Sequence, residues 1–224
     1  MAQGFGAFGK MPSVGDFFRI SPPPGFVTPW DGWIQQAMLD AQTTMGTDWD
    51  AHYMSAPIWR FSLAAGLAGP EKAMGVLMPS VDRVGRRFPL TLATALPTPG
   101  PAQLDHFSEE PLFEQLEDVA LGALDENVTR DALEQQLAAL QPPQFRSAPP
   151  VCKLGATLVL TQSDLLIPDL AAGLLADHYA RPSVWSAIVN DEPRLMICEG
   201  LPQGADLLGL FHLGTRIWTE ARPI

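Results

Sequence analysis

The sequence predicts an α/β fold, in which a mixed β-sheet is covered by helices on both faces as a layered α/β/α sandwich. Three observations support this prediction. Short apolar segments typical of strands recur along the 224 residues, amphipathic helical segments lie between them, and the two kinds do not alternate strictly. A regular βαβ array would alternate, so a mixed sheet is favoured. A hydrophobic content of 46% and a mean hydropathy of +0.06 argue against disorder.

The N-terminal part of the chain is expected to combine short strands with one long helix. Strands are predicted over residues 4–9, 15–20, 57–63, 73–78 and 87–95. The prolines of 21–25 force a loop after the second strand, because proline fixes φ and lacks an amide donor. The spacing of apolar residues predicts a helix next, with Thr28 as its cap, Pro29 at its first position and Gly46 at its end.

The C-terminal part is expected to add further strands and helices to the same sheet. Helices are predicted after Ser108 as a cap, over 129–140, over 168–179 and from Pro202. Strands are predicted near 156–161, 183–189 and 194–199. Segment 141–150 has four prolines and is the best linker candidate. One domain over 1–224 is preferred, and a subdomain break at 141–150 is the alternative.

Charge excludes several classes of function. Acids outnumber bases 25 to 14, which disfavours binding to nucleic acid or to anionic lipid. Residues 105–134 hold ten acids against Arg130 alone. A solvated helix surface is the simpler interpretation of this segment, and a surface that steers a basic partner is the alternative.

The sequence also bears on location and on the state of the thiols. No apolar run is long enough to insert into a membrane, and the first residues lack a secretory signal pattern. Two cysteines, Cys152 and Cys198, do not make a disulfide framework, and both are expected to be buried, inert thiols. These features predict a cytoplasmic protein.

The glycine-rich segment from Gly4 to Lys10 matches the Gly-x-Gly-x-x-Gly pattern and the first seven places of a P-loop. Only three residues precede it, Met11 stands where a P-loop needs a hydroxyl, and Pro12 disfavours a helix. The glycines are therefore expected to let a strand lie close to its neighbours. The four histidines and two cysteines show no metal-ligand spacing, and no Gly-x-Ser-x-Gly elbow is present. No metal, cofactor or catalytic residue is predicted.

One group of residues is a candidate partner- or ligand-binding site. Its members are Asp16, Trp59, Arg60, Ser80, Asp82, Arg83 and Arg86. In a structural interpretation, Asp16 and Asp82 neutralise Arg60 and Arg83, because an unpaired charge beside a core is costly. In a functional interpretation, the arginines grip a carboxylate or phosphate on a shallow polar surface and tryptophan supplies contact area.

Several blocks of the sequence closely resemble the TagF (ImpM) family of type VI secretion-associated proteins. The blocks are Phe5–Phe17, Pro29–Trp33, Ala56–Phe61 and Gly75–Leu90. The similarity is weaker in Pro182–Ser186 and Cys198–Pro202. The family's recurrent Gly-Asp, Trp-Arg and Ser-Val-Asp-Arg elements correspond to Gly15-Asp16, Trp59-Arg60 and Ser80 through Arg83.

The resemblance implies a layered α/β fold and a cytoplasmic, non-enzymatic accessory protein that restrains type VI secretion assembly after translation. It implies protein–protein binding, through a forkhead-associated partner. A small-ligand-sensing or enzymatic domain with an Asp/Arg site for an anionic substrate is the alternative, and a constitutive structural part of the machine is a third.

Overall fold

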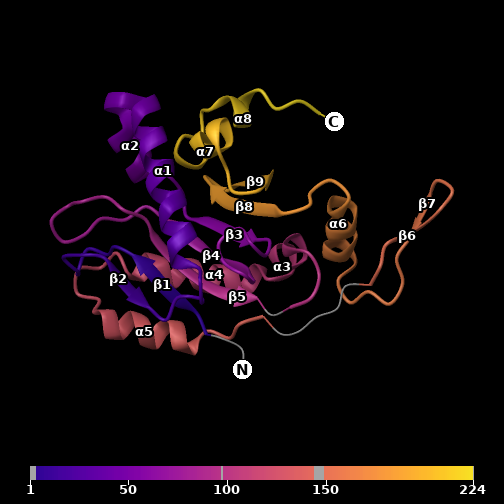
Figure 1. Ribbon diagram of the computed structural model, residues 1–224, viewed down its shortest axis with the longest axis horizontal. Helices are drawn as coiled ribbons and strands as arrows, with labels where there is room; N and C mark the ends of the chain where they lie inside the picture. Colours follow the sequence, from indigo (N-terminus) through magenta and orange to yellow (C-terminus); the bar gives the residue numbers. More distant parts are fainter. Residues whose placement is uncertain (1–3, 97, 144–148, 224) are drawn as a thin grey trace.

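A computed structural model of the protein describes residues 4–96, 98–143 and 149–223. Its centre is a seven-stranded sheet with the order β2-β1-β5-β4-β3-β8-β9 (Figure 1). The strands are β1 (Gly6–Gly9), β2 (Phe18–Ile20), β3 (Trp59–Leu63), β4 (Lys72–Met78), β5 (Leu90–Leu96), β8 (Pro182–Val189) and β9 (Glu192–Glu199). All six pairings are antiparallel, so the sheet is more uniform than the mixed one expected.

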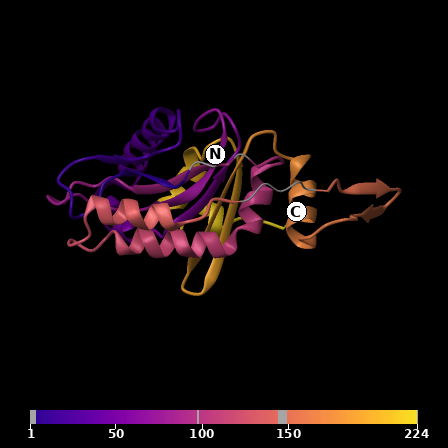
Figure 2. The same cartoon turned by 90° about the horizontal axis from the view of Figure 1, so that it is seen from below.

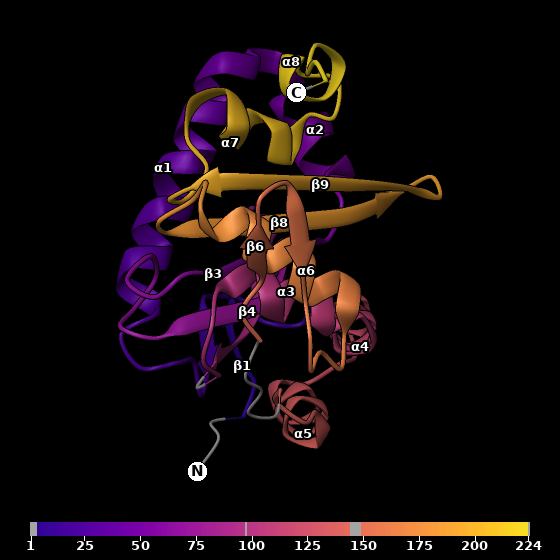
Figure 3. The same cartoon turned by 90° about the vertical axis from the view of Figure 1, so that its right-hand side faces the viewer.

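Helices cover both faces of the sheet, which confirms the layered α/β fold (Figure 2). One face packs against α1 (Val27–Met45), α2 (Trp49–Ser55), α7 (Gly204–Phe211) and α8 (Arg216–Thr219). The opposite face packs against α4 (Glu110–Gly122) and α5 (Arg130–Ala139). A short 3-10 turn, Gly46–Asp48, joins α1 to α2. Two more helices, α3 (Ala102–Ser108) and α6 (Leu166–Ala176), lie side by side, with α3 next to β3 and β8 (Figure 3).

The central strands supply side chains to two separate cores, because successive residues of a strand point to opposite faces. On β4, Met74, Val76 and Met78 belong to the core under α4 and α5. The alternate residues Ala73 and Leu77 belong to the core under α1 and α7. This confirms the prediction that the apolar 73–78 segment is covered on both sides.

Two residues predicted to cap helices, Thr28 and Ser108, do not do so. Helix α1 begins at Val27 without a side-chain cap, so Thr28 lies inside the helix and its predicted capping role is wrong. For the same reason Pro29 is the third residue of the helix and not, as predicted, the first. Gly46 ends the helix with φ of 57°, as expected for a glycine stop. Ser108 does not cap the acidic helix α4, because it ends α3 and its hydroxyl donates to the Leu104 carbonyl at 2.6 Å.

Residues after the proline-rich segment extend the sheet and add a small separate hairpin. Residues 144–148 of that segment lie outside the described residues, and beyond them β8 pairs with β3, so the sheet continues. The strand predicted near 156–161 corresponds to β7 (Thr157–Val159), which forms a hairpin with β6 (Cys152–Leu154), a strand that was not predicted. The hairpin projects from the body beside α6 (Figures 1 and 2). Cys152 on this hairpin is exposed, contrary to expectation, whereas Cys198 on β9 is buried as predicted.

The glycines of the first strand serve close packing. A Cβ atom on Gly6 would collide with the backbone carbonyl oxygen of Ser21, and one on Gly9 with that of Pro89. Gly9 also has φ of +133°, a conformation that other residues rarely adopt. The chain continues from Gly9 into an irregular connection and then β2, not into the helix that a phosphate-binding loop requires.

Candidate functional site

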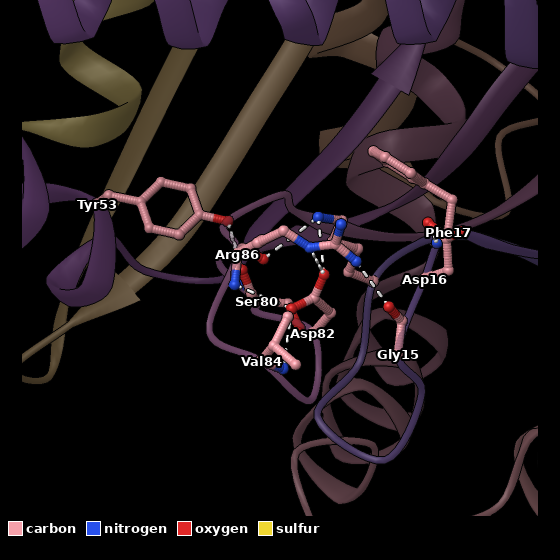
Figure 4. A network of polar contacts seen from close by, with 9 residues as sticks. Gly15, Asp16, Phe17, Tyr53, Ser80, Asp82, Val84 and Arg86 are labelled. Atoms are coloured by element: carbon pink, nitrogen blue, oxygen red, sulfur yellow. Dashed lines mark hydrogen bonds and ion pairs between the residues drawn. The ribbon is translucent and has the colours of Figure 1, made fainter.

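Two loops meet at one end of the sheet, and Asp82 lies at their junction (Figure 4). Segment 10–17 joins β1 to β2, and segment 79–89 joins β4 to β5. Asp82 is only 2% exposed. Its Oδ1 accepts hydrogen bonds from the amides of Val84 at 3.1 Å and Arg86 at 2.9 Å. Its Oδ2 lies 2.7 Å from Nε of Arg86 and 3.0 Å from Nζ of Lys10.

These contacts keep Asp82 ionised. Burial opposes the charge on its carboxylate, but the amide of Arg86, the ammonium of Lys10, the Arg86 guanidinium and the amide of Val84 together outweigh that effect. The pKa of Asp82 is therefore held well below its usual range. All four donors belong to the two loops, so the carboxylate acts as an internal anchor.

Two hydrogen bonds to backbone carbonyls of the first loop fix the relative position of the two loops. Nη2 of Arg86 donates to the Gly15 carbonyl at 2.7 Å, and the Arg83 amide donates to the Val14 carbonyl at 3.1 Å. The loop around Asp82 is also closed internally, since the Asp82 amide donates to the Arg86 carbonyl at 3.1 Å. The two loops therefore form one rigid unit.

Tyr53 of α2 holds the start of the second loop from inside the protein. Its hydroxyl donates to the Ser80 carbonyl at 2.8 Å and accepts from the Ser80 amide at 3.1 Å. Burial raises the pKa of Tyr53, only partly offset by the bond to Ser80 and by the charge of Arg87. Ser80 is 1% exposed, and within the described residues its Oγ has no hydrogen-bond partner. Ser80 thus contributes its backbone to the site.

The exposed side chains of the paired loops include the guanidinium of Arg83 and two apolar groups. Arg83 is exposed, and it makes no ion pair within the part of the chain that the structure describes. Val84 is 71% exposed and Phe17 is 47% exposed. Phe17 is supported from below by an edge contact with Phe88, with ring centroids 4.6 Å apart. We call Arg83, Val84 and Phe17 the loop face.

A pocket of about 440 Å³ adjoins this face. Its walls are formed by Pro12, Ser13, Val81, Asp82, Arg83, Gly85 and Glu126. Glu126 comes from the connection between α4 and α5, so the pocket separates the loop face from the acidic helices. Its charged groups are one guanidinium and two carboxylates.

The structure separates Arg60 from the loops, and the predicted pairing of Arg60 and Arg83 with Asp16 and Asp82 is wrong. Arg60 projects toward α4, where its guanidinium binds both oxygens of Glu117 at 2.7 and 2.8 Å and Oε1 of Glu110 at 2.5 Å. The bond to Glu117 contributes most to raising the pKa of Arg60, against the effect of burial. Asp16 is exposed and accepts a hydrogen bond from the Phe17 amide at 2.8 Å.

Two of the ten acids in segment 105–134 therefore neutralise Arg60 of β3, and a third, Asp105, pairs with Lys72 of β4. The sequence pattern predicted a solvated helix surface, and Glu114 and Asp118 of α4 are indeed exposed. Glu110 and Glu117 instead hold α4 against β3 through Arg60. This function could not be seen in the sequence, because the partners are separated by 50 and 57 residues.

Trp59 is also remote from the loops. It lies on the opposite face of β3 from Arg60, is 2% exposed, and donates its indole N–H to the Leu210 carbonyl at 2.8 Å. The loops thus bring together Ser80, Asp82 and Arg86, with Asp16 beside them (Figure 4). Arg83 belongs to the same loops through its backbone contact with Val14, whereas Trp59 and Arg60 lie elsewhere. Sequence reasoning missed Lys10, Tyr53, Phe17 and Val84 as members of this site.

Two further findings concern the residues 4–96, 98–143 and 149–223. No group of three or more His, Cys, Asp or Glu side chains there could hold a metal ion. No helix in the same ranges has the length and apolar character needed to cross a membrane.

Comparison with known proteins connects the fold to a family. The profile described as "TagF N-terminal domain, Type VI secretion system-associated" matches residues 6–140, which include both loops, β3 and α4. The crystal structure of PA0076 from Pseudomonas aeruginosa PAO1 is similar over 98% of this chain and 97% of that one, with 32% identity and a TM-score of 0.77. No curated protein matches the sequence.

Proposed function

The chain belongs to the TagF family of type VI secretion-associated proteins, and we propose that it is a non-enzymatic cytoplasmic protein that restrains assembly of this system after translation. It would act by binding another protein through the loop face. A forkhead-associated component of the system is the proposed partner, on the basis of the family resemblance.

The observation that carries this proposal is the exposed guanidinium of Arg83, which makes no ion pair among the described residues. It lies next to Val84 in the chain and on the same pair of loops as Phe17, and Asp82 holds these loops in place. Arginine and aromatic side chains dominate the energy of many protein interfaces. A preorganised loop also loses little conformational entropy on binding. The loop face therefore has the composition and the rigidity of a docking surface.

The polar groups beneath the loop face favour binding over catalysis. A general acid, base or nucleophile must reach a substrate and exchange a proton with it. The carboxylate of Asp82 is occupied by four donors, and Ser80 is buried. These side chains are used to hold the loop.

The charges of the pocket beside Arg83 fit a protein partner better than the alternative, a small anionic ligand. The guanidinium of Arg83 faces the pocket, but the carboxylates of Asp82 and Glu126 also form its walls. One guanidinium against two carboxylates disfavours a free ligand that carries more than one negative charge. A partner that brings one acidic side chain to Arg83 and apolar groups to Val84 and Phe17 fits this surface better.

Restraint by such a protein requires no chemistry. The protein would occupy the surface that its partner uses for assembly. By mass action, this lowers the concentration of free partner that can assemble. The strength of restraint should therefore depend on the ratio of the two proteins. A constitutive structural part would instead remain in purified active assemblies.

The proposal is tested by affinity capture from a lysate of cells that express the secretion cluster, followed by mass spectrometry. Wild type and Arg216→Glu, a control on α8 with an 84% exposed side chain, should recover the forkhead-associated component. Arg83→Glu should recover about tenfold less, as expected for loss of an interface arginine. Recovery of no secretion component by wild type, or equal recovery by Arg83→Glu, would contradict the proposal.

A further inference from the structure

A second cavity, remote from the loop face, has a volume of about 510 Å³. Its walls come from the ends of β3 and β5, the start of β4, α3, and the segment that joins α6 to β8. This size is within the range of small-ligand sites, which bury most of the ligand. No part of the cavity is used by the function proposed above.

Gln103 of α3 is the unusual feature of this cavity. The residue is 0% exposed and lines the cavity. Neither Nε2 nor Oε1 of its carboxamide has a hydrogen-bond partner among the described residues. Buried polar atoms are nearly always paired, since leaving them unpaired is costly. A carboxamide offers a donor and an acceptor together, which matches the C=O and N–H of a peptide group.

The charges around the cavity indicate a ligand with a single negative charge. Nζ of Lys72 is already bonded to Oδ2 of Asp105 at 2.5 Å and to Oγ1 of Thr98 at 3.0 Å, so its charge is neutralised. Arg181 is exposed, and only its backbone amide is engaged among the described contacts, with Glu199. One free guanidinium at the rim suits a carboxylate, which it can bind with two hydrogen bonds. Glu71, also at the rim, disfavours a dianion such as phosphate.

The remaining walls are mainly apolar, and most of their side chains are small, with Leu96 and Tyr179 as the larger ones. The small ones include Ala64, Ala102, Ala176 and Pro182. Such walls leave room for the side chains of one or two residues of a ligand. We propose that this cavity binds a peptide carboxyl terminus, with the terminal carboxylate on Arg181 and the preceding peptide group on Gln103.

The ligand could be supplied as a free dipeptide or as the end of another protein. Titration of the ¹⁵N-labelled full chain, followed by NMR, distinguishes the two. The probes are alanyl-alanine, N-acetyl-alanyl-alanine and the carboxyl-terminal amide of the latter. The acetylated acid should shift the amide signals of residues lining the cavity and bind about tenfold more tightly than its amide, because a charge-assisted pair is lost in the amide. Tighter binding of the free dipeptide would assign the site to dipeptides, and tighter binding of the acetylated form would assign it to protein ends.

Two variants separate recognition from folding. Arg181→Gln should abolish the preference for the acid, whereas the control Arg216→Gln should keep it. Gln103→Leu, close in volume, should lose binding and raise the Tm of the free protein, because two unpaired buried atoms are removed. The proposal is overturned if no probe shifts the cavity signals, if acid and amide bind equally, or if Gln103→Leu binds normally or has a lower Tm. None of these results bears on the loop face.

Discussion

Nε of Arg86 lies 2.7 Å from Oδ2 of Asp82, and Nη2 of the same guanidinium lies 2.7 Å from the Gly15 carbonyl. The side chain of Arg86 thus joins Asp82 of the second loop to the backbone of the first loop. The Arg86 side chain is 58% exposed, but its hydrogen bonds are directed into the protein. Arg83, three residues earlier, makes no such bonds within the described residues and leaves its guanidinium exposed. The two arginines therefore have different functions.

Asp82→Asn should loosen the loops without changing the volume of the side chain. The amide loses the charge that four donors share and cannot accept from all of them. Hydrogen exchange at the Val84 and Arg86 amides should become faster by about tenfold or more, since local opening becomes easier. Asp177→Asn, on an exposed residue, is the control. Unchanged exchange at both amides in the Asp82 variant would contradict the anchoring role.

Arg60→Ala should destabilise the protein, because it leaves Glu117 half-buried without its partner. Loss of one member of a buried pair costs about 3–5 kcal/mol, and hydration of the exposed Glu110 reduces this to about 2–3 kcal/mol here. Urea unfolding measures the difference. A double variant with Glu117→Gln should recover part of the loss. Arg216→Ala, which breaks an exposed pair, should stay within about 0.5 kcal/mol of wild type, and an equally small effect for Arg60→Ala would refute the assignment.

His106 should make the protein less stable as the pH falls. Its Nε2 lies 2.8 Å from Oγ of Ser186 and its Nδ1 lies 3.1 Å from Oγ of Ser62. Burial, with a smaller effect of the Arg60 charge, lowers the pKa of His106 from 6.5 to about 3. The unfolded chain therefore binds a proton below pH 6.5 that the folded chain does not bind until about pH 3. The associated stability is complete above pH 6.5 and is lost as the pH falls toward 3.

The slope from one such group is at most about 1.4 kcal/mol per pH unit. Between pH 7 and pH 5, wild type should thus lose about 2 kcal/mol more unfolding free energy than His106→Gln. Urea titrations at both pH values provide the measurement. His178→Gln, on an exposed histidine, should keep the pH dependence of wild type. Equal pH dependence of wild type and His106→Gln would show that folding does not lower the pKa of His106.

The two thiols should differ in reactivity. Cys152 is exposed on the projecting hairpin, whereas burial, together with Asp206, raises the pKa of Cys198 to about 12. Because the thiolate is the nucleophile, an aromatic disulfide reagent at pH 8 should modify Cys152 at least about a hundredfold faster. Cys152→Ser should remove the fast phase, and urea should expose the second thiol. Two fast phases in the folded wild type would contradict the burial of Cys198.

The main elements of the fold follow from local patterns. The apolar segment 73–78 and the periodic segment after Pro29 have strand and helix patterns that need no tertiary information. The helix α3 could not be predicted in this way, because its buried face carries Gln103, Asp105 and His106, which resemble a surface pattern. Only the second strand of the β6–β7 hairpin was predicted, because Lys153 interrupts the apolar residues of the three-residue strand β6.

The candidate site could be predicted only within each loop. Asp82 and Arg86 are four residues apart, so their association is local, and the block that contains them resembles the family. The contributions of Lys10 and Tyr53 depend on how β1 and α2 pack beside the second loop. Arg60 was misplaced because the sequence does not specify which acid of a distant helix faces β3. Long-range pairing is set by topology, and local patterns do not contain it.

Calorimetric titration of the purified forkhead-associated protein with wild type and Arg83→Glu is the most direct measurement of the role proposed for the loop face. Reversing the charge at Arg86 would also break its bonds to Asp82 and Gly15, so Arg83 gives the cleaner test. We predict a Kd at least about tenfold weaker for Arg83→Glu, with an unchanged Tm and an unchanged Kd for Arg216→Glu. An equal Kd for wild type and Arg83→Glu, in correctly folded protein, would contradict docking through this surface.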